Sequence, residues 1–182
     1  NPKLKYALKI EKIAKSSVRK TLSNPLWREI EFTDTIFKIN SNHFIHLIAH
    51  DIIKKCNTEI PKSLSKIYNN KFRNAISKIQ ASTICSRKIY SLINVINIST
   101  LLNNLPIKHI YSLVVQLAYA IYIMHSNGYT HNDLHIKNIG AIKTSSKFIE
   151  IGNIKIPTYG YIIKIIDYGT VLHKKYILGI SM

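Results

Sequence analysis

The sequence predicts an α+β fold, because strand patterns and helical patterns occupy separate stretches of the chain. Apolar residues alternate around Lys9 near the start, which is typical of a strand. From Pro106 to His125, apolar residues recur at spacings of three and four, which predicts a long amphipathic helix that ends before Gly128. Residues 139–166 contain short β-rich runs, including an expected hairpin around Gly152. At 182 residues the chain is long enough for one domain with a good core.

A second helix is predicted to begin near Trp27, with Asn24 and Pro25 as start signals. Phe32 and Ile36 then share one helical face with Glu29. Residues 43–50 have a β-like composition and predict a loop followed by a strand. His46 and His50 lie four positions apart, as in helical metal pairs, but the β-like composition argues against a metal site there. Residues 89–96 predict another strand that leads into a connector.

The chain is strongly basic, with 26 Lys and Arg against 9 Asp and Glu and a net charge of +17. Such a balance allows nucleic acid or an acidic membrane surface as a partner. The basic residues are scattered, without an Arg-rich block or interleaved aromatic residues, so neither partner is favoured. Heavy use of Ile, Lys and Asn is what an AT-rich genome produces.

The two cysteines and the longest apolar stretch suggest a protein of the cytoplasm. Cys56 and Cys85 have no metal-binding spacing and no disulfide framework, which predicts a reducing compartment. The apolar stretch from Ile110 to Met124 contains Ser112 and Gln116, and it is expected to be too short to span a bilayer.

Two short motifs carry the chemistry. Asp133 and Asn138 lie five positions apart, just after the long predicted helix, and Asp167 is followed by Tyr168 and Gly169. Phosphoryl transfer from ATP needs one carboxylate that orients the attacking hydroxyl and accepts its proton. It also needs a carboxamide and a second carboxylate as oxygen ligands for Mg²⁺.

This order of motifs resembles that of the eukaryotic-type protein kinase family. By this resemblance Asp133 is the catalytic base, Asn138 and Asp167 are the metal ligands, and His131 has a structural role. The resemblance also implies the cofactors ATP and Mg²⁺. It further implies that an elongated β-hairpin returns the chain from Asn138 to Asp167, so that the two metal ligands lie side by side.

The resemblance extends to the first half of the chain. Lys9 follows Ala7 in an Ala-x-Lys pattern, which in the family contacts the α- and β-phosphates of ATP. The family pairs this lysine with a glutamate on a helix; Glu29, 20 positions later, is the expected partner and Glu31 the alternative. The hinge that binds adenine is expected at three residues, Asn94, Val95 and Ile96.

Three departures from the family pattern bear on function. Asn132 replaces the Arg that in many members responds to a phosphorylated activation loop, so this mode of control is expected to be absent. His135 replaces the usual Lys and could contact the γ-phosphate, less strongly than Lys would. The sequence Asp133-Leu134-His135 is also similar to small-molecule kinases of the choline and aminoglycoside type. Tyr168 replaces Phe, which is a mild change.

The resemblance covers nearly the whole chain but only the middle of a kinase domain. We therefore expect residues 1–182 to form an incomplete protein-kinase-like domain, with a partial small β-rich lobe and the first part of a mainly helical large lobe. The small-lobe part is expected at 1–96, with an insertion at about 56–87. The large-lobe part, with the catalytic loop, is expected at 97–182. The compressed pattern and the composition also resemble kinases of large DNA viruses.

These observations lead to one main functional hypothesis and three alternatives. The main hypothesis is an ATP-dependent phosphotransferase, a Ser/Thr protein kinase with a protein acceptor. The alternatives are a small-molecule kinase on the same scaffold and a catalytically inactive, pseudokinase-like binding module. The third is a metal hydrolase built on His131, Asp133 and His135.

Overall fold

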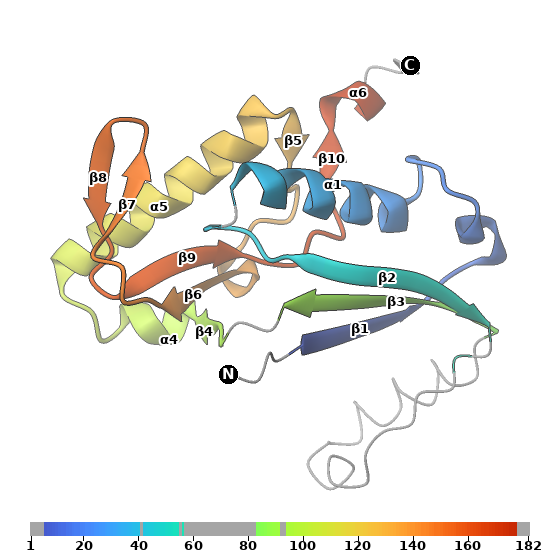
Figure 1. Ribbon diagram of the computed structural model, residues 1–182, viewed down its shortest axis with the longest axis horizontal. Coiled ribbons are helices and arrows are strands. Elements are labelled where there is room, and N and C mark those ends of the chain that lie inside the picture. Colours follow the sequence, from blue (N-terminus) through green and yellow to red (C-terminus); the bar gives the residue numbers. More distant parts are fainter. Residues whose placement is uncertain (1–5, 41, 55, 57–82, 92–93, 178–182) are drawn as a thin grey trace, which may run out of the picture.

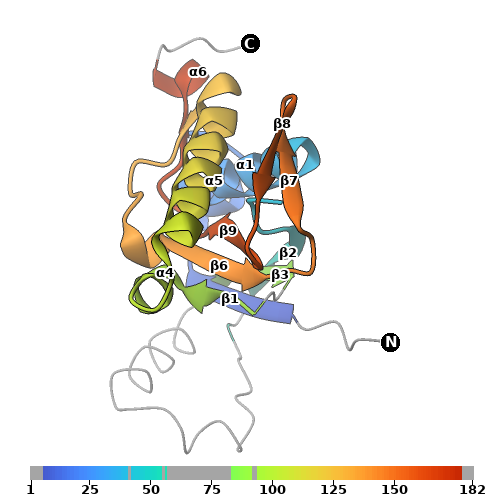
Figure 2. The ribbon, with the colours of Figure 1, turned by 90° about the vertical axis from the view of Figure 1, so that its left-hand side faces the viewer.

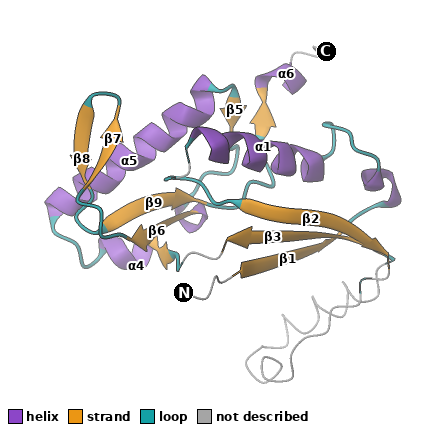
Figure 3. Cartoon of the chain, in the orientation of Figure 1, coloured by secondary structure: helices purple, strands orange, loops and turns teal. Residues whose placement is uncertain are grey.

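A computed structural model of the chain describes most of its length, and Figures 1 and 3 show how its elements are arranged. The predicted insertion lies mostly outside the described residues. Described are residues 6–40, 42–54, 56, 83–91 and 94–177.

The first part of the chain is a three-stranded antiparallel sheet with a helix beside it (Figure 1). Strand β3 (Ile84–Ser91) lies in the middle, between β1 (Tyr6–Lys12) and β2 (Leu47–Lys54). A short 3₁₀ turn (Lys15–Val18) leads from β1 toward α1 (Pro25–Ile39). The strand and helix predicted for this part are confirmed.

Helix α1 begins where its start signals, Asn24 and Pro25, predict. The side chain of Asn24 accepts a hydrogen bond from the backbone N–H of Leu26 at 2.9 Å, which satisfies one free donor of the first turn. Pro25 occupies the first turn, where its missing N–H costs nothing. Phe32 and Ile36 are fully buried, so the apolar face of the helix packs into the core.

The second part is built around a long helix and a second small sheet. It begins with β4 (Ile96–Asn97) and α4 (Ile98–Leu102), followed by α5 (Ile107–Ser126), β5 (Tyr129–Thr130) and a 3₁₀ turn (Ile136–Asn138). In Figure 2, α5 lies in front and the hairpin of two later strands stands beside it. These later elements are β6 (Ile139–Lys143), β7 (Phe148–Ile151), β8 (Ile154–Pro157), β9 (Tyr161–Ile165), β10 (Leu172–His173) and α6 (Lys174–Ile177).

The predicted return of the chain from Asn138 to Asp167 is confirmed. Strands β6 and β9 pair antiparallel, with Ile139 opposite Ile165, and β7 and β8 form the expected hairpin. The backbone N–H of Ile166 donates to the carbonyl of Asn138 at 3.0 Å. The pairing therefore brings the start of the second motif next to the end of the first.

Helix α5 is held to β9 by a buried amide. Gln116, fully buried, accepts from the backbone N–H of Ile163 at 3.0 Å and donates to the carbonyl of Tyr161 at 3.2 Å. Ser112, also buried, donates to the carbonyl of Pro157. The two polar residues that interrupt the apolar stretch thus satisfy backbone groups at the edge of the sheet.

Helix α5 has 20 residues, as does the predicted helix from Pro106 to His125. Its mean hydropathy over an 18-residue window is 1.3, so it is long and apolar enough to cross a membrane by length and composition only, whereas the sequence predicts a stretch from Ile110 to Met124 that is too short. One such helix is weak evidence, because core helices of soluble proteins meet the same criterion. Part of its hydropathy comes from exposed residues on the outer face, such as Val114.

The loop after α1 links the two parts of the chain. The backbone N–H of Ile165 donates to the carbonyl of His43 at 2.9 Å, and the ring of His43 hydrogen-bonds the carbonyl of Ile163 at 3.2 Å. Lys164 donates from Nζ to the carbonyl of Phe44 at 3.1 Å. Residues 43–44 are therefore fixed to β9, directly before Asp167.

This link makes stability depend on pH. Burial lowers the pKa of His43 to about 4, although its bond to Ile163 acts the other way. Because the folded pKa lies below the unfolded value, the stabilisation is complete above about pH 6.5 and is lost as the pH falls toward 4, by about 3 kcal/mol in all. Urea unfolding of the wild type and of His43→Gln between pH 7 and pH 4.5 measures this. We expect the free energy of unfolding to fall less with decreasing pH in the variant than in the wild type. An equal fall in both would contradict the role of His43 in the pH dependence.

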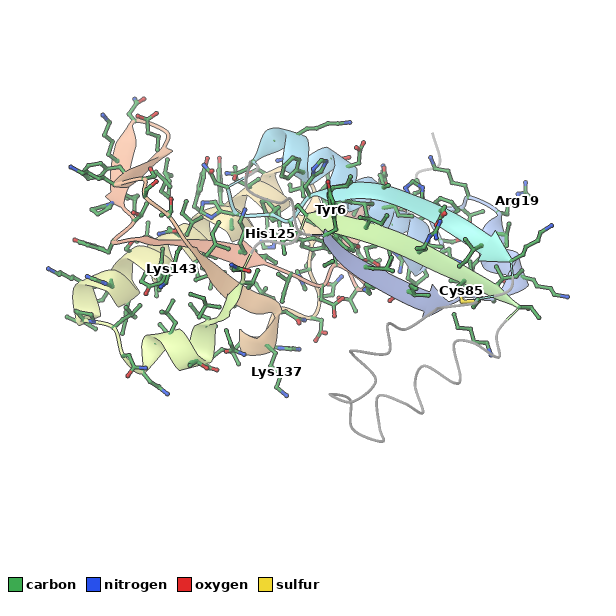
Figure 4. All side chains as sticks on the ribbon, turned by 60° about the horizontal axis from the view of Figure 1, so that its bottom comes forward. Tyr6, Arg19, Cys85, His125, Lys137 and Lys143 are labelled. Atoms are coloured by element: carbon green, nitrogen blue, oxygen red, sulfur yellow. A yellow bond between two sulfur atoms is a disulfide. The ribbon has the colours of Figure 1, made fainter. Side chains whose placement is uncertain are left out.

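The two cysteines form a disulfide, so the prediction that they do not is wrong. Cys56 follows β2 and Cys85 lies in β3, where it pairs with Ile53 of β2. The antiparallel register therefore brings together two residues 29 positions apart. Figure 4 shows Cys85 at the end of the sheet opposite to Tyr6. Disulfides persist mainly in oxidising environments, so the argument for a reducing compartment no longer holds; a cytoplasmic location stays a prediction.

Replacing both cysteines by serine is expected to lower the free energy of unfolding by about 3–4 kcal/mol, because the bond restricts the unfolded chain. Denaturant unfolding with and without a reductant measures the effect. The wild type with reductant should unfold like the double variant under either condition. Equal stability of the oxidised and reduced wild type would contradict the prediction.

Candidate active site

The site is a cavity of about 560 Å³ between the first sheet, α1 and the segment that follows β9. Its lining is mainly apolar and includes Ala7, Ile45 and Ile166. It also carries charged side chains from three different elements. These are Lys9 of β1, Glu29 of α1 and Asp167 after β9.

Lys9 joins these elements. Its Nζ lies 3.3 Å from Oε1 of Glu29 and 3.3 Å from Oδ1 of Asp167. Burial alone would lower the pKa of Lys9, but the nearby carboxylates outweigh it and raise that pKa well above its ordinary value. Lys9 is therefore a permanent cation on the wall of the cavity. The pairing of Lys9 with Glu29 agrees with the prediction, whereas Glu31, the alternative, points elsewhere and contacts Lys175.

A second lysine shares Glu29, and sequence reasoning missed it. Lys88 of β3 contacts Oε2 of Glu29 and lies 2.5 Å from Oε2 of Glu11, whose Oε1 is 3.1 Å from Lys9. Two lysines and two glutamates thus alternate in a closed ring. Tyr90 adds a hydrogen bond to Oε1 of Glu29 at 2.7 Å. We call Lys9, Glu11, Glu29 and Lys88 the charge ring.

The register of the sheet explains the ring. Lys9 of β1 lies opposite Lys88 of β3, a pairing of like charges that destabilises a sheet unless anions intervene. Lys88 and Tyr90 alternate onto the same face of β3 and so both reach Glu29. Lys88 is 0% exposed and cannot reach a ligand, whereas the side chain of Lys9 is 34% exposed at the cavity. The alternation in β3 could have shown that Lys88 and Tyr90 share one face of the strand. The pairing of β3 with β1, which brings Lys88 to Glu11, could not be predicted from one sequence.

The residues of the first motif, Asp133 and Asn138, lie between β5 and β6, and neither is among the residues that line the cavity. Asn138 donates from Nδ2 to the backbone carbonyl of Asp133 at 3.0 Å, which leaves its side-chain oxygen as the atom for a cation. The Asp133 carboxylate is about half exposed, with Asn138 Nδ2 at 3.5 Å from Oδ2. Asn132, at φ 62°, donates to the carbonyl of Thr170 at 3.1 Å, a neutral contact where the family has Arg.

The second motif is fixed by its neighbours. His131 is buried, and its Nε2 lies 3.2 Å from the carbonyl of Ile166; burial lowers the pKa of His131 and so favours the neutral ring. The hydroxyl of Tyr168 donates to the carbonyl of Ile165 and accepts from the N–H of Ile45 at 3.0 Å. Asp167 itself adopts φ 59°, a conformation that Asp and Asn tolerate better than most residues.

His135 lies beside the proposed base. Its Nδ1 accepts from the backbone N–H of Lys137 at 3.2 Å, so in this conformation Nδ1 is unprotonated and the ring proton is on Nε2. Nε2 is 3.7 Å from Oδ1 of Asp133. A neutral His135 therefore directs a donor toward the Asp133 carboxylate.

Two of the three predicted hinge residues line the cavity. These are Asn94 and Val95, and Val95 fits closely over Gly140, where an added Cβ would lie 2.1 Å from Cγ1 of Val95. Ile96, the third, is not among the lining residues: in β4 it pairs with Ala141 of β6, and it packs against a separate apolar cluster.

The suspected metal-binding histidines have other roles. His46 stacks on Phe37 at 4.1 Å between ring centroids, and His50 meets Trp27 edge to face at 5.9 Å. Among the residues that the structure describes, no group of three His, Cys, Asp or Glu could hold a metal ion. The hydrolase hypothesis therefore has no support, since His131 and His135 do not form such a group.

This arrangement of strand lysine, helix glutamate, catalytic loop and returning aspartate is that of a protein-kinase-like fold. No family model matches the sequence, and no curated protein matches it. Among solved structures the chain is similar to kinase-like WaaP, described as "WaaP in complex with acyl carrier protein". The TM-score is 0.51 and the identity 12%, over 93% of this chain and 54% of WaaP. The chain thus spans about half of WaaP, and the likeness concerns the fold alone.

Proposed function

We propose that the chain is the nucleotide-binding and catalytic part of an ATP-dependent phosphotransferase, which transfers the γ-phosphate of ATP to a hydroxyl. One observation carries the proposal: the ammonium of Lys9 bridges Glu29 and Asp167 on the wall of a largely apolar cavity. An adenine ring needs apolar walls, and phosphates need a fixed cation. The lining of the cavity offers both.

The charge ring prepares Lys9 for this role. Glu29 is held by Lys88 and Tyr90 as well as by Lys9, so Lys9 can turn toward phosphates without leaving Glu29 uncompensated. Lys9 would therefore bind the phosphates while the ring keeps α1 in place. Backbone groups near Asn94 and Val95 would contact the adenine.

The residues around Asp167 fit a magnesium ion. The Asp167 carboxylate and the free side-chain oxygen of Asn138 are the hard oxygen ligands that Mg²⁺ prefers. When bound, Mg²⁺ would offset the negative charge of the phosphates. The Ile166–Asn138 backbone bond holds together the segments that carry these two residues, directly before β6 and just after β9.

Asp133 would orient the acceptor hydroxyl and take its proton. The new bond forms between the acceptor oxygen and the γ-phosphorus, the bond from that phosphorus to the bridging oxygen breaks, and ADP leaves. The half-exposed carboxylate is open to an acceptor from solvent. Most of the acceleration would come from positioning and electrostatics.

Protein Ser/Thr hydroxyls are one acceptor class, and small-molecule hydroxyls are the second. His135 favours the second, because it places a neutral donor beside Asp133 where protein kinases have a lysine. A screen of protein, sugar and choline acceptors separates the two. A third outcome, nucleotide binding without transfer to any of them, would favour a binding module.

Calorimetric titration with ATP, with and without Mg²⁺, tests the proposal on the wild-type chain and on Asp167→Asn. We expect binding that Mg²⁺ strengthens in the wild type and that loses this dependence in the variant. A folded wild-type chain that binds no ATP under either condition would refute the proposal for this chain.

A further inference from the structure

We propose that Glu31, Lys175 and Tyr176 form a strut that holds α1 against the segment after Gly169. They would act as positioning residues for the contact between Lys9 and Glu29. The consequence for catalysis rests on the proposed function, but the positioning itself does not.

The strut consists of two donors on one carboxylate. Lys175 Nζ lies 2.6 Å from Oε1 of Glu31, and the hydroxyl of Tyr176 donates to Oε2. The side chains of Glu31 and Lys175 are only 27% and 28% exposed, so this pair is better shielded than an ordinary surface ion pair. Burial would raise the pKa of Glu31, but the two hydrogen bonds outweigh it and lower that pKa, which keeps the carboxylate charged.

The other end of the strut is tied to the catalytic-loop side. Strand β10 pairs with β5, with His173 opposite Tyr129, and the N–H of Lys174 donates to the carbonyl of Gly128 at 2.8 Å. Gly128 has φ 77°, and a Cβ there would lie 2.9 Å from Nε2 of His173. Only glycine fits this position without strain. The Lys174–Gly128 bond therefore anchors the start of α6 directly before β5, three positions ahead of His131.

The two glutamates of α1 therefore face different supports. Glu29 and Glu31 are two positions apart, and at about 100° per residue their side chains point to nearly opposite sides of the helix. Glu29 faces the charge ring, whereas Glu31 faces α6. Figure 1 shows α6 and β10 on the side of α1 opposite to the first sheet. Losing the strut frees α1 on that side.

The contacts of the segment after Gly169 with the first motif are neutral hydrogen bonds. Asn132 donates to the carbonyl of Thr170, and Thr170 donates to the carbonyl of His131. The Lys175–Glu31 pair supplies a charged link between this segment and α1. This link needs no phosphorylated residue. It agrees with Asn at position 132, where many protein kinases have an Arg that binds a phosphorylated activation loop.

The test compares Glu31→Gln with Asp34→Asn in the full chain. Both changes remove one carboxylate charge from α1, but Asp34 pairs with Lys38 on the exposed side of the helix, where both side chains are about 70% exposed. The readout is the labelling rate of the Lys9 amine by an acylating reagent, followed by mass spectrometry. Lys164, buried in β9, serves as the internal reference for global unfolding.

We expect Glu31→Gln to speed the labelling of Lys9 by about three- to tenfold, because α1 spends more time away from Lys9. Asp34→Asn should leave the rate unchanged. The swap Glu31→Lys with Lys175→Glu should restore the slow rate. An unchanged rate in Glu31→Gln, a swap that does not restore it, or an equal rise at Lys164 would each overturn the proposal.

The labelling needs no nucleotide, so it separates this proposal from the proposed function. If the wild type binds Mg²⁺-ATP, the dissociation constant should rise in Glu31→Gln and return in the swap. If it binds none, the proposed function fails while the labelling still decides whether the strut positions α1.

Discussion

Asp133→Asn is expected to slow phosphoryl transfer by about 10²–10⁴-fold, while Mg²⁺-ATP binding changes little. The variant keeps the shape of the side chain but cannot accept the proton of the acceptor hydroxyl. Asp133 makes no contact with Lys9 and its carboxylate is half exposed, so its loss should leave the cavity intact. Consumption of ATP with an acceptor from the screen measures the rate, and calorimetry measures the binding.

Asp167→Asn is the matched control for this prediction. It makes the same chemical change 34 positions later. Asn tolerates φ 59° as Asp does, so the backbone should not move. This variant should lose the magnesium dependence of binding as well as the transfer. Two variants with the same defects would contradict the separate roles of base and metal ligand.

The sequence was most informative where a local motif fixes the chemistry. The pattern around Lys9 and the Asp-Tyr-Gly motif identified two residues that line the cavity, Lys9 and Asp167. The spacing of Asp133 and Asn138 identified a loop that a backbone hydrogen bond from Ile166 joins to the segment before Asp167. The preference for Glu29 over Glu31 came from the family pattern and its separation of 20 positions from Lys9, and the structure agrees, because Glu29 shares a face of α1 with buried Phe32 and Ile36.

Contacts that depend on strand register could not be predicted in this way. Lys88 is one of many lysines in the sequence, and only the pairing of β1 with β3 places it against Glu29 and Glu11. The Cys56–Cys85 disulfide likewise follows from the register of β2 with β3 across 29 positions. A one-residue shift would turn these side chains to the other face.

Lys88→Met is expected to lower the free energy of unfolding by about 3 kcal/mol, because it removes the cation that compensates two carboxylates. Met has a similar length and apolar character, so packing changes little. Lys9 and Tyr90 still contact Glu29 in the variant. We therefore expect a loss of stability at the lower end of the roughly 3–5 kcal/mol that breaking a buried ion pair costs. Urea unfolding measures it, with Lys38→Met, from an exposed pair, expected within about 0.5 kcal/mol of the wild type.

The double variant Glu11→Gln with Lys88→Met separates charge from packing. If the single variant suffers from an excess of negative charge, neutralising Glu11 should recover part of the lost stability. If it suffers from a poorly filled space, the second change should add a further loss. Recovery would mean that Lys88 balances the carboxylates that hold α1, which would leave Lys9 as the cation of the ring that is free to bind phosphates. A further loss would mean that Lys88 acts by packing, and the charge ring would then not explain how α1 is held.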